Sequence, residues 1–263
     1  MSRLELPAVT LCAATSVNVR ATIEAIRTSM QKVEFAECLL FTDAKVDLPP
    51  PDLKVVAIEC LKSAADYSHF LLHQLAAHVG TSHCLVIQWD GFVINAGEWD
   101  PDYLRYDYIG ATWPQFQDGR DVGNGGFSLR SARLLQACLD PDFKSAHPED
   151  LAICRANRDL LESKYGIRFA DAATAERFAF ERSRPQMPTF GFHGVFNLVP
   201  LLGARRFGQM YLSLDDRTTI FQDLRLLLKQ LRGDRNGNLL RRRLVLDWLR
   251  WLASRNRRKA QAT

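Results

Sequence analysis

Short apolar runs alternate with helix-like segments through the first half of the chain. A short continuous apolar run between turn-forming residues is typical of a strand that is buried on both faces. Between these runs, apolar residues recur every three or four positions, which predicts helices. This alternation favours an α/β fold with a mixed, mainly parallel, Rossmann-like sheet flanked by helices. We predict strands at 8–13, 38–41, 54–58 and 84–87, a helix carrying Val19, Ile23, Ile26, Met30 and Val33, and a helix carrying Tyr67, Leu71, Leu75 and Val79.

The second half departs from this simple alternation. Residues 95–130 are rich in Trp, Tyr, Asp and Gly, and we expect mostly loops there. Ser131 is suited to cap a following helix, and Pro148 opens another helix that Gly166 can end. The apolar stretch at 167–170 predicts a further strand.

The pattern changes again near the C-terminus. Apolar residues from Leu240 to Trp251 fall on one face at helical spacing, and arginines surround them. Glycines and asparagines at 233–238 are expected to break the chain before this helix. We therefore predict an α/β domain at 1–210 and an amphipathic basic helical extension at 211–263.

The composition is that of a globular protein with a large core. The chain has 263 residues, of which 47% are hydrophobic and 24% charged. We find no signal peptide and no stretch near the roughly 18 apolar residues that span a bilayer, so we expect a cytoplasmic protein, at most peripheral to the inner face of the membrane. The six cysteines show no C-x-x-C pair or zinc-ligand spacing, which favours buried reduced thiols.

Charge is distributed unevenly along the chain. The stretch 225–259 contains 12 basic and two acidic residues, a local charge of +10; because the whole chain carries +4, the rest carries −6. A basic helix with Trp and Leu on its other face suits an anionic membrane surface, but it also suits a helix packed on the body with a solvated basic rim. Nucleic-acid binding is disfavoured, because no known module is recognisable.

One candidate for chemistry stands directly after the fourth predicted strand. Asp90, in Gln88-Trp89-Asp90-Gly91, lies where open α/β sheets bind ligands, outside the carboxyl ends of the strands. An aspartate there can hold a divalent cation or a ribose hydroxyl. Equally, it can start an Asx-turn into Gly91.

Three later segments carry further candidates. Gly125 and Gly126 allow a ligand close to the backbone, or they form a hairpin turn. Glu149 and Asp150 can supply a general base, or they only favour a helix N-terminus. His193 stands between glycines and aromatics, either structural or a metal ligand. Neither a G-x-G-x-x-G after the first strand nor a P-loop motif is present, which disfavours dinucleotide and P-loop nucleotide binding.

The order of these segments resembles that of β-1,4-galactosyltransferase-type enzymes with the GT-A fold. Those enzymes show a metal-binding Asp, a Gly-Gly turn, a Glu-Asp pair and a later metal-ligating His. More closely, the chain resembles a bacterial family of uncharacterised proteins with a predicted glycosyltransferase domain. The resemblance covers roughly residues 8–200 and rests on the phrases QWDGFVIN, YDYIGATWP, VGNGGFSLRS, HPEDLAIC and FGFHGVFN.

The resemblance implies roles for individual residues. Asp90 and His193 would bind Mn²⁺ or Mg²⁺ that bridges the diphosphate of a nucleotide-sugar donor. Asp150 would be the base that activates an acceptor hydroxyl, and Glu149 would bind the acceptor or orient the base. The donor and its nucleotide would lie near Thr10, Thr15, Tyr67, Ser68, Gln88, Gly125 and Gly126. Apart from the resemblance, Arg130 can meet the charge of a phosphate or acceptor or form a surface or structural ion pair. Trp113, like Trp89 and Trp99, can stack on a sugar ring of the acceptor or donor or be a buried core aromatic.

One residue departs from the pattern that the resemblance implies. Gln88 stands where the first acid of the Asp-x-Asp metal motif is expected, and a neutral glutamine is a poorer metal ligand. Three hypotheses therefore remain. The first is a glycosyltransferase of glycan synthesis, which inverts the anomeric configuration if the acceptor attacks opposite the leaving group. The second is a non-catalytic sugar- or nucleotide-binding module docked at the membrane, and the third is a nucleotidyltransferase or metal-dependent hydrolase. The third requires at least two acids on one metal ion.

Overall fold

The computed structural model describes residues 3–233 and 235–261, without the side chains of 235 and 257–261. Within it the chain divides into two compact units, Met1–Gly194 and Val195–Thr263. The sequence places a domain boundary at 210–211 instead, inside a helix of the second unit.

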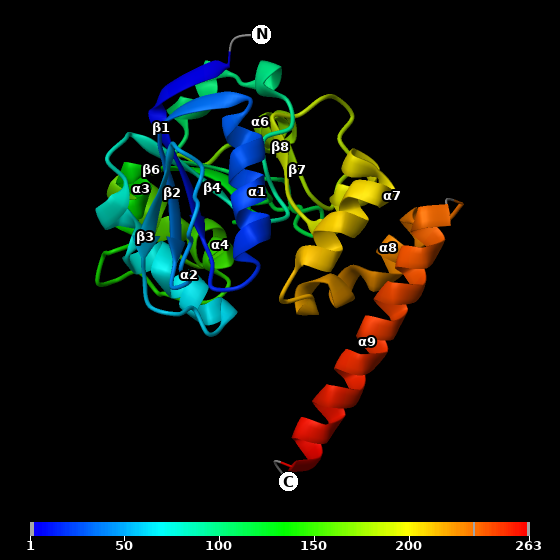
Figure 1. Ribbon diagram of the computed structural model, residues 1–263. Helices are drawn as coiled ribbons and strands as arrows, with labels where there is room; N and C mark the ends of the chain where they lie inside the picture. The colour runs from blue at the N-terminus through cyan, green and yellow to red at the C-terminus, as the bar shows by residue number, and fades with distance from the viewer. Residues whose placement is uncertain (1–2, 234, 262–263) are drawn as a thin grey trace. The chain divides into compact units, whose positions relative to one another are not determined.

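The first unit is built on a six-stranded sheet in the order β3-β2-β1-β4-β6-β5 (Figure 1). The strands β1 to β4 pair in parallel, whereas β6 runs antiparallel to both β4 and β5. This arrangement confirms the predicted α/β fold with a mixed, mainly parallel sheet. The strands are β1 (Leu4–Ala14), β2 (Val33–Thr42), β3 (Leu53–Ala57), β4 (His83–Ile87), β5 (Tyr108–Ile109) and β6 (Phe127–Ser131), and a separate parallel pair joins β7 (Ala179–Phe180) to β8 (Gly191–Phe192).

Helices cover the sheet because its strands are apolar on both faces. On one face, Cys12, Leu39 and Val86 pack against Phe70 and Leu71 of α2 in one buried cluster. Ser63 caps α2 and Ser131 caps α3, each accepting a hydrogen bond from a backbone N–H three residues later. The helices of this unit are α1 (Val19–Met30), α2 (Ala64–His73), α3 (Ala132–Ala137), α4 (Glu149–Leu151), α5 (Arg158–Tyr165) and α6 (Ala172–Phe178), with 3-10 turns at Leu75–His78, Ala96–Glu98 and Pro101–Arg105 and a π-helical turn at Ala152–Ala156.

Several local predictions were wrong. Val33 begins β2 instead of continuing a helix, and Val79 lies beyond the 3-10 turn that follows α2. Phe169 forms only an isolated bridge to Tyr108, so 167–170 is not a strand. Of the six cysteines, Cys60 is exposed while the other five are buried and none is in a disulfide.

The second unit is helical. It contains α7 (Val195–Ser213), which kinks at Gly203, a 3-10 turn at Thr218–Asp223, α8 (Leu224–Gln230) and α9 (Arg235–Gln261). The predicted basic helix is therefore present, but it starts at Arg235, so the expected break at 233–238 is mostly helix. Tyr211 of α7 donates a hydrogen bond to Asp247 of α9 over 2.9 Å. No described helix is long and apolar enough to cross a bilayer.

Candidate functional site

The candidate site forms where β4 ends, at the carboxyl edge of the parallel strands. The N–H of Gln88 donates to the carbonyl of Gly126 over 3.0 Å, and the N–H of Gly194 donates to the carbonyl of Asp90 over 3.0 Å. These two backbone bonds bring the start of β6 and the segment after β8 to the turn that carries Asp90. Three segments that are distant in sequence therefore meet in the first unit.

Asp90 and His193 face each other in this site. Oδ1 of Asp90 lies 3.4 Å from Nε2 of His193, and Oε1 of Gln88 lies 3.2 Å from the same nitrogen. Glu181 stands on the other side of the ring, with its Oε1 3.6 Å from Nδ1. Oδ1 of Asp90 is buried and forms no well-aligned hydrogen bond with any residue that the structure describes.

The two carboxylates control the charge of the imidazole. Burial disfavours the charged form, but Asp90 and Glu181 outweigh it and raise the pKa of His193 to about 10. Conversely, although burial raises the pKa of Glu181, its contact with His193 lowers that pKa overall. A divalent cation bound at Nε2 would have to displace the proton there.

Glycines make room for this arrangement. An added Cβ on Gly126 would lie 2.1 Å from Nε2 of His193, and one on Gly91 would lie 3.2 Å from Cδ2 of the same ring. A Cβ on Gly125 would lie 2.1 Å from Oε1 of Glu149. Side chains therefore rest directly on the glycine backbone at these three positions, which explains why these positions require glycine.

Glu149 is held in a buried ion pair beneath the glycine turn. Its Oε1 accepts a hydrogen bond from Nη2 of Arg130 at 2.9 Å, and its Oε2 accepts one from Ser68 at 3.3 Å. The side chain of Arg130 is 0% exposed and that of Glu149 6%. Arg130 also donates to the carbonyl of Gly125 over 3.3 Å and to Oγ of Ser128 over 3.0 Å. This pair therefore fixes the shape of the turn.

Asp150 is held from the other side of the same turn. Its Oδ2 accepts a hydrogen bond from the N–H of Gly125 at 3.0 Å, and its Oδ1 accepts one from the N–H of Leu151 at 2.8 Å. Asp150 is partly exposed. Burial of the carboxyl and the negative charge of Glu149 raise the pKa of Asp150. A raised pKa and a fixed orientation suit a general base.

The donor atoms around His193 fit a divalent cation that has few protein ligands. The 3.4 Å between Oδ1 of Asp90 and Nε2 of His193 is spanned by two metal–ligand bonds of about 2.1 Å each. Glu181 at Nδ1 matches the carboxylate that orients many metal-binding histidines. Among the described residues, no group of three or more His, Cys, Asp or Glu is arranged to hold a metal ion. Asp90 and His193 are therefore the two ligands of this kind that the described residues would offer such a cation.

Other residues that the sequence singled out lie at varying distances from this centre. Ser68 contacts the ion pair through its hydrogen bond to Glu149. Burial and the negative charge of Glu149 raise the pKa of Tyr67, which precedes Ser68 in α2. Thr15 lies at the carboxyl end of β1, where its N–H donates to the carbonyl of Phe41.

Two predicted residues are placed differently from what the sequence suggested. Thr10 is fully buried in the middle of β1, where it bonds to Thr81 and pairs with Cys84 near the start of β4, so its side chain is not exposed at the carboxyl edge where the site lies. Trp113 is 6% exposed and packs on Gly123, within a core cluster. Its ring is therefore not open for stacking on a sugar.

Sequence reasoning missed Glu181. The parallel pairing of β7 and β8 sets Phe180 opposite Phe192. Glu181 and His193 directly follow these two residues, and the pairing therefore brings them side by side. A two-residue strand gives no periodic pattern. The one available signal is the apolar pair 179–180 directly before the acid.

Comparisons with known proteins give the following matches. No curated protein sequence matches the chain significantly. The solved structure of the mannosyltransferase PcManGT from Pyrobaculum calidifontis, in complex with GDP-Man and Mn²⁺, is similar with a TM-score of 0.43 and 13% sequence identity, covering 89% of this chain and 68% of that chain. The model of the family "Protein of unknown function (DUF5672)" matches residues 52–193, which hold β3, β4, β6 and the whole site around Asp90 and His193. The chain belongs to this family.

Proposed function

We propose that this protein is a glycosyltransferase that moves a sugar from a nucleotide-sugar donor to an acceptor hydroxyl. The observation that carries the proposal is the Gly125–Gly126 turn. The imidazole of His193 rests on Gly126, while the carboxylate of Asp150 accepts the N–H of Gly125. Because the Cα atoms of neighbouring residues lie about 3.8 Å apart, His193 and Asp150 contact one short turn, which supports placing the assigned metal ligand and the assigned base in the same site.

In this mechanism the two sides of the turn have different tasks. Asp90, His193 and Gln88 would hold Mn²⁺ or Mg²⁺, which supplies positive charge against the leaving diphosphate. Asp150 would accept the proton of the acceptor hydroxyl as that oxygen attacks the anomeric carbon. Attack from the face opposite the leaving group inverts the anomeric configuration.

Neighbouring residues would shape the site without reacting. The bare backbone at Gly125 and Gly126 lets Glu149 and His193 lie directly against the turn, because a side chain at either glycine would collide with them. Arg130 and Glu149 neutralise each other under the turn, so we assign them to positioning it. This proposal keeps Asp150 as the base and assigns Glu149 to its orientation through the turn.

The proposal implies a set of partners. The donor is a nucleoside diphosphate sugar, and the acceptor is a glycan or a lipid-linked glycan, as in the synthesis of bacterial surface polysaccharide. We expect this chemistry on the cytoplasmic side, with the protein peripheral to the membrane.

A thermal-shift screen tests the proposal. Nucleoside diphosphates, uridine diphosphate among them, and their sugar nucleotides should raise the melting temperature more with Mn²⁺ than without it, because a ligand that binds only the folded state stabilises it. Asp90→Asn and His193→Ala should lose the Mn²⁺-dependent part. Asp47→Asn, at an exposed carboxylate paired only with Lys45, serves as the matched control.

Gln88 favours a second candidate function, that of a module that binds a sugar nucleotide without catalysing transfer. Its amide oxygen stands 3.2 Å from His193 where an acid would bind a cation more strongly. A module that binds a sugar nucleotide without reacting would show the same stabilisation. It would, however, release no sugar from any donor in a hydrolysis and transfer assay.

A further inference from the structure

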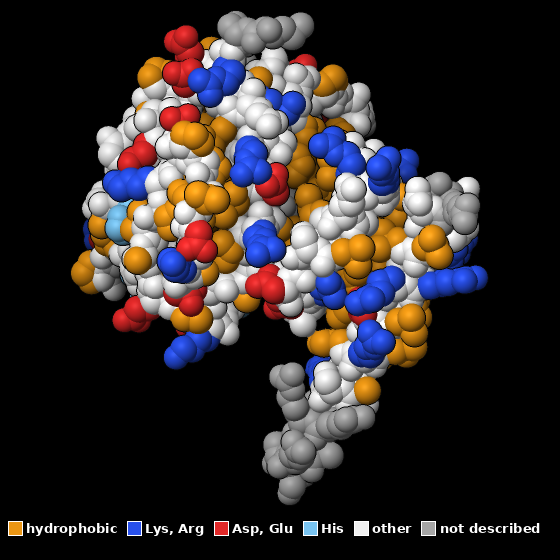
Figure 2. Space-filling model, viewed as in Figure 1, with side chains coloured by type: hydrophobic (Ala, Val, Ile, Leu, Met, Phe, Trp, Pro, Cys, Tyr) orange, Lys and Arg blue, Asp and Glu red, His pale blue; other side chains and the backbone are white. Residues whose placement is uncertain are grey.

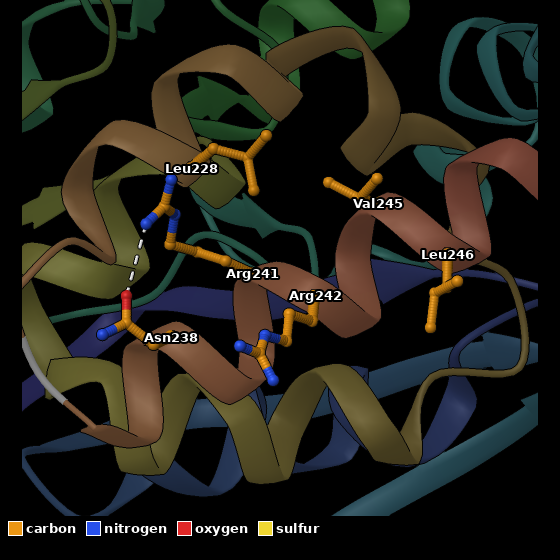
Figure 3. A pocket seen from close by; sticks show the side chains of 6 residues that line it. All are labelled: Leu228, Asn238, Arg241, Arg242, Val245 and Leu246. Carbon is orange, nitrogen blue, oxygen red and sulfur yellow. Dashed lines mark hydrogen bonds between the residues drawn. The ribbon is translucent and has the colours of Figure 1, made fainter.

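The helical unit Val195–Thr263 contains a groove that the proposed transfer chemistry does not use. Its volume is about 690 Å³, and it lies between α8 and α9. Figure 3 shows the six lining side chains, one from α8 and five from α9: Leu228, Asn238, Arg241, Arg242, Val245 and Leu246. The groove is thus apolar along part of its wall and carries two guanidinium groups.

These two guanidinium groups have no counter-charge among the described residues. Arg241 donates from Nη1 to Oδ1 of Asn238 over 3.3 Å, and its Nε is buried without a hydrogen-bond partner in the described part of the chain. Arg242 is exposed. The acid of α9, Asp247, is already paired with Arg217, Arg243 and Arg250. Arg241 and Arg242 are therefore available to an external anion.

An exposed apolar stripe runs beside the groove. Leu239, Leu246 and Leu249 are 59%, 51% and 49% exposed. Together with Arg242 they recur every three or four residues, so they lie on one face of α9. Figure 2 shows Lys and Arg side chains interspersed with hydrophobic ones over this helical unit. Leucines among arginines suit the boundary between lipid headgroups and acyl chains.

We propose that this groove docks the protein on a bilayer that contains anionic phospholipid. Arg241 and Arg242 contact a headgroup phosphate, and the exposed leucines enter the edge of the hydrocarbon. Because none of the described helices can cross a bilayer, α9 lies on the surface. A nucleic acid offers phosphates but no apolar phase for the leucines, and a second copy of the chain would set arginines against arginines. This inference names the surface for the peripheral membrane association expected above, and it stands without the proposed sugar transfer.

Vesicle flotation of the full chain tests the proposal. The chain should bind vesicles of phosphatidylcholine with about 30% phosphatidylglycerol, and not phosphatidylcholine alone, with binding that weakens as salt rises. Removing both charges with Arg241→Gln and Arg242→Gln should lower the partition coefficient about 30-fold, since each arginine near the surface contributes about fivefold. Arg242→Gln alone, at an exposed residue, should cost about fivefold.

Controls separate this site from a general effect of charge. Arg27→Gln with Arg105→Gln removes the same charge from exposed residues of the first unit and should leave binding unchanged. Leu246→Ser with Leu249→Ser should remove the binding that remains at high salt. Equal binding to neutral vesicles, full binding without Arg241 and Arg242, or displacement from vesicles by an RNA hairpin would each overturn the proposal.

Discussion

Replacing Gly126 by alanine tests whether the imidazole of His193 rests on bare backbone. An ideal Cβ at this position would lie 2.1 Å from Nε2, 2.4 Å from Cδ2 and 2.5 Å from Cε1 of that ring. The backbone of Gly126 is not in the left-handed region, so its own conformation accepts alanine. Since unbonded heavy atoms settle near 3.5 Å, the ring would have to move by about 1.4 Å. Such a shift would change the 3.4 Å separation between Nε2 of His193 and Oδ1 of Asp90.

The size of the effect follows from the clash. Overpacking of a buried site costs about 1–3 kcal/mol, and in a protein of this size each kcal/mol lowers the melting temperature by about 2–4 °C. We therefore expect Gly126→Ala to melt about 2–12 °C lower than the wild type, and to lose the additional stabilisation by Mn²⁺ with a nucleoside diphosphate. Gly80→Ala, where an added Cβ meets nothing within 4 Å, is the matched control.

A double-mutant cycle identifies the origin of the loss. With the ring removed by His193→Ala, the alanine at position 126 has room, so the double variant should match His193→Ala within about 0.5 kcal/mol. The reasoning is refuted if Gly126→Ala is as stable as the wild type, or if His193→Ala gives no rescue. Either result would place the imidazole elsewhere than on this turn.

The remaining predictions concern three carboxylates. Glu149→Gln should lower the free energy of unfolding by about 3–5 kcal/mol, because it leaves Arg130 buried without its counter-charge. If urea unfolding shows unchanged stability but the variant has no activity, Glu149 takes part in the reaction instead. Glu181→Gln should weaken Mn²⁺ binding about 10–100-fold in titration calorimetry by releasing the orientation of His193, and unchanged affinity would contradict this role. Because the pKa of Asp150 is raised above its ordinary 3.8, kcat/KM should fall on acidification at a pH above that value. An acid limb of kcat/KM at or below pH 3.8 would exclude Asp150 as the base. The raised pKa also makes the folded state bind more protons than the unfolded state, so the contribution of Asp150 to the free energy of unfolding decreases as pH rises from 3.8 through the raised pKa.

The sequence predicted the parallel part of the sheet well because its strands are buried on both faces. Buried runs such as the one that ends in Ile87 stand out from the helices between them. The sequence does not predict the antiparallel strand β6. Phe127–Ser131 follows two glycines that favour a turn, and it includes the charged Arg130. That arginine looks like a surface residue until its buried partner Glu149 is known.

The meeting of Asp90 and His193 was expected from the resemblance in the order of the motifs, whereas each segment taken alone left a structural alternative open. The position of Asp90 directly after β4 indicated the carboxyl edge of the sheet as its place. Glu181 depends on the register of two-residue strands, which local sequence does not encode. The resemblance places Thr10 near the nucleotide, but Thr10 lies in the middle of β1 with its side chain fully buried.

The central claim is that Asp150 removes a proton during sugar transfer at this site. The most direct measurement follows release of nucleoside diphosphate from a panel of sugar nucleotides by the wild type and by Asp150→Asn, each incubated with Mn²⁺ and glycan acceptors. The account predicts release by the wild type with at least one donor, a loss of about 10²–10⁴-fold in the variant, and equal stabilisation of both by the nucleotide. Turnover by Asp150→Asn at the wild-type rate would contradict it, as would a wild type that binds nucleotides but transfers no sugar.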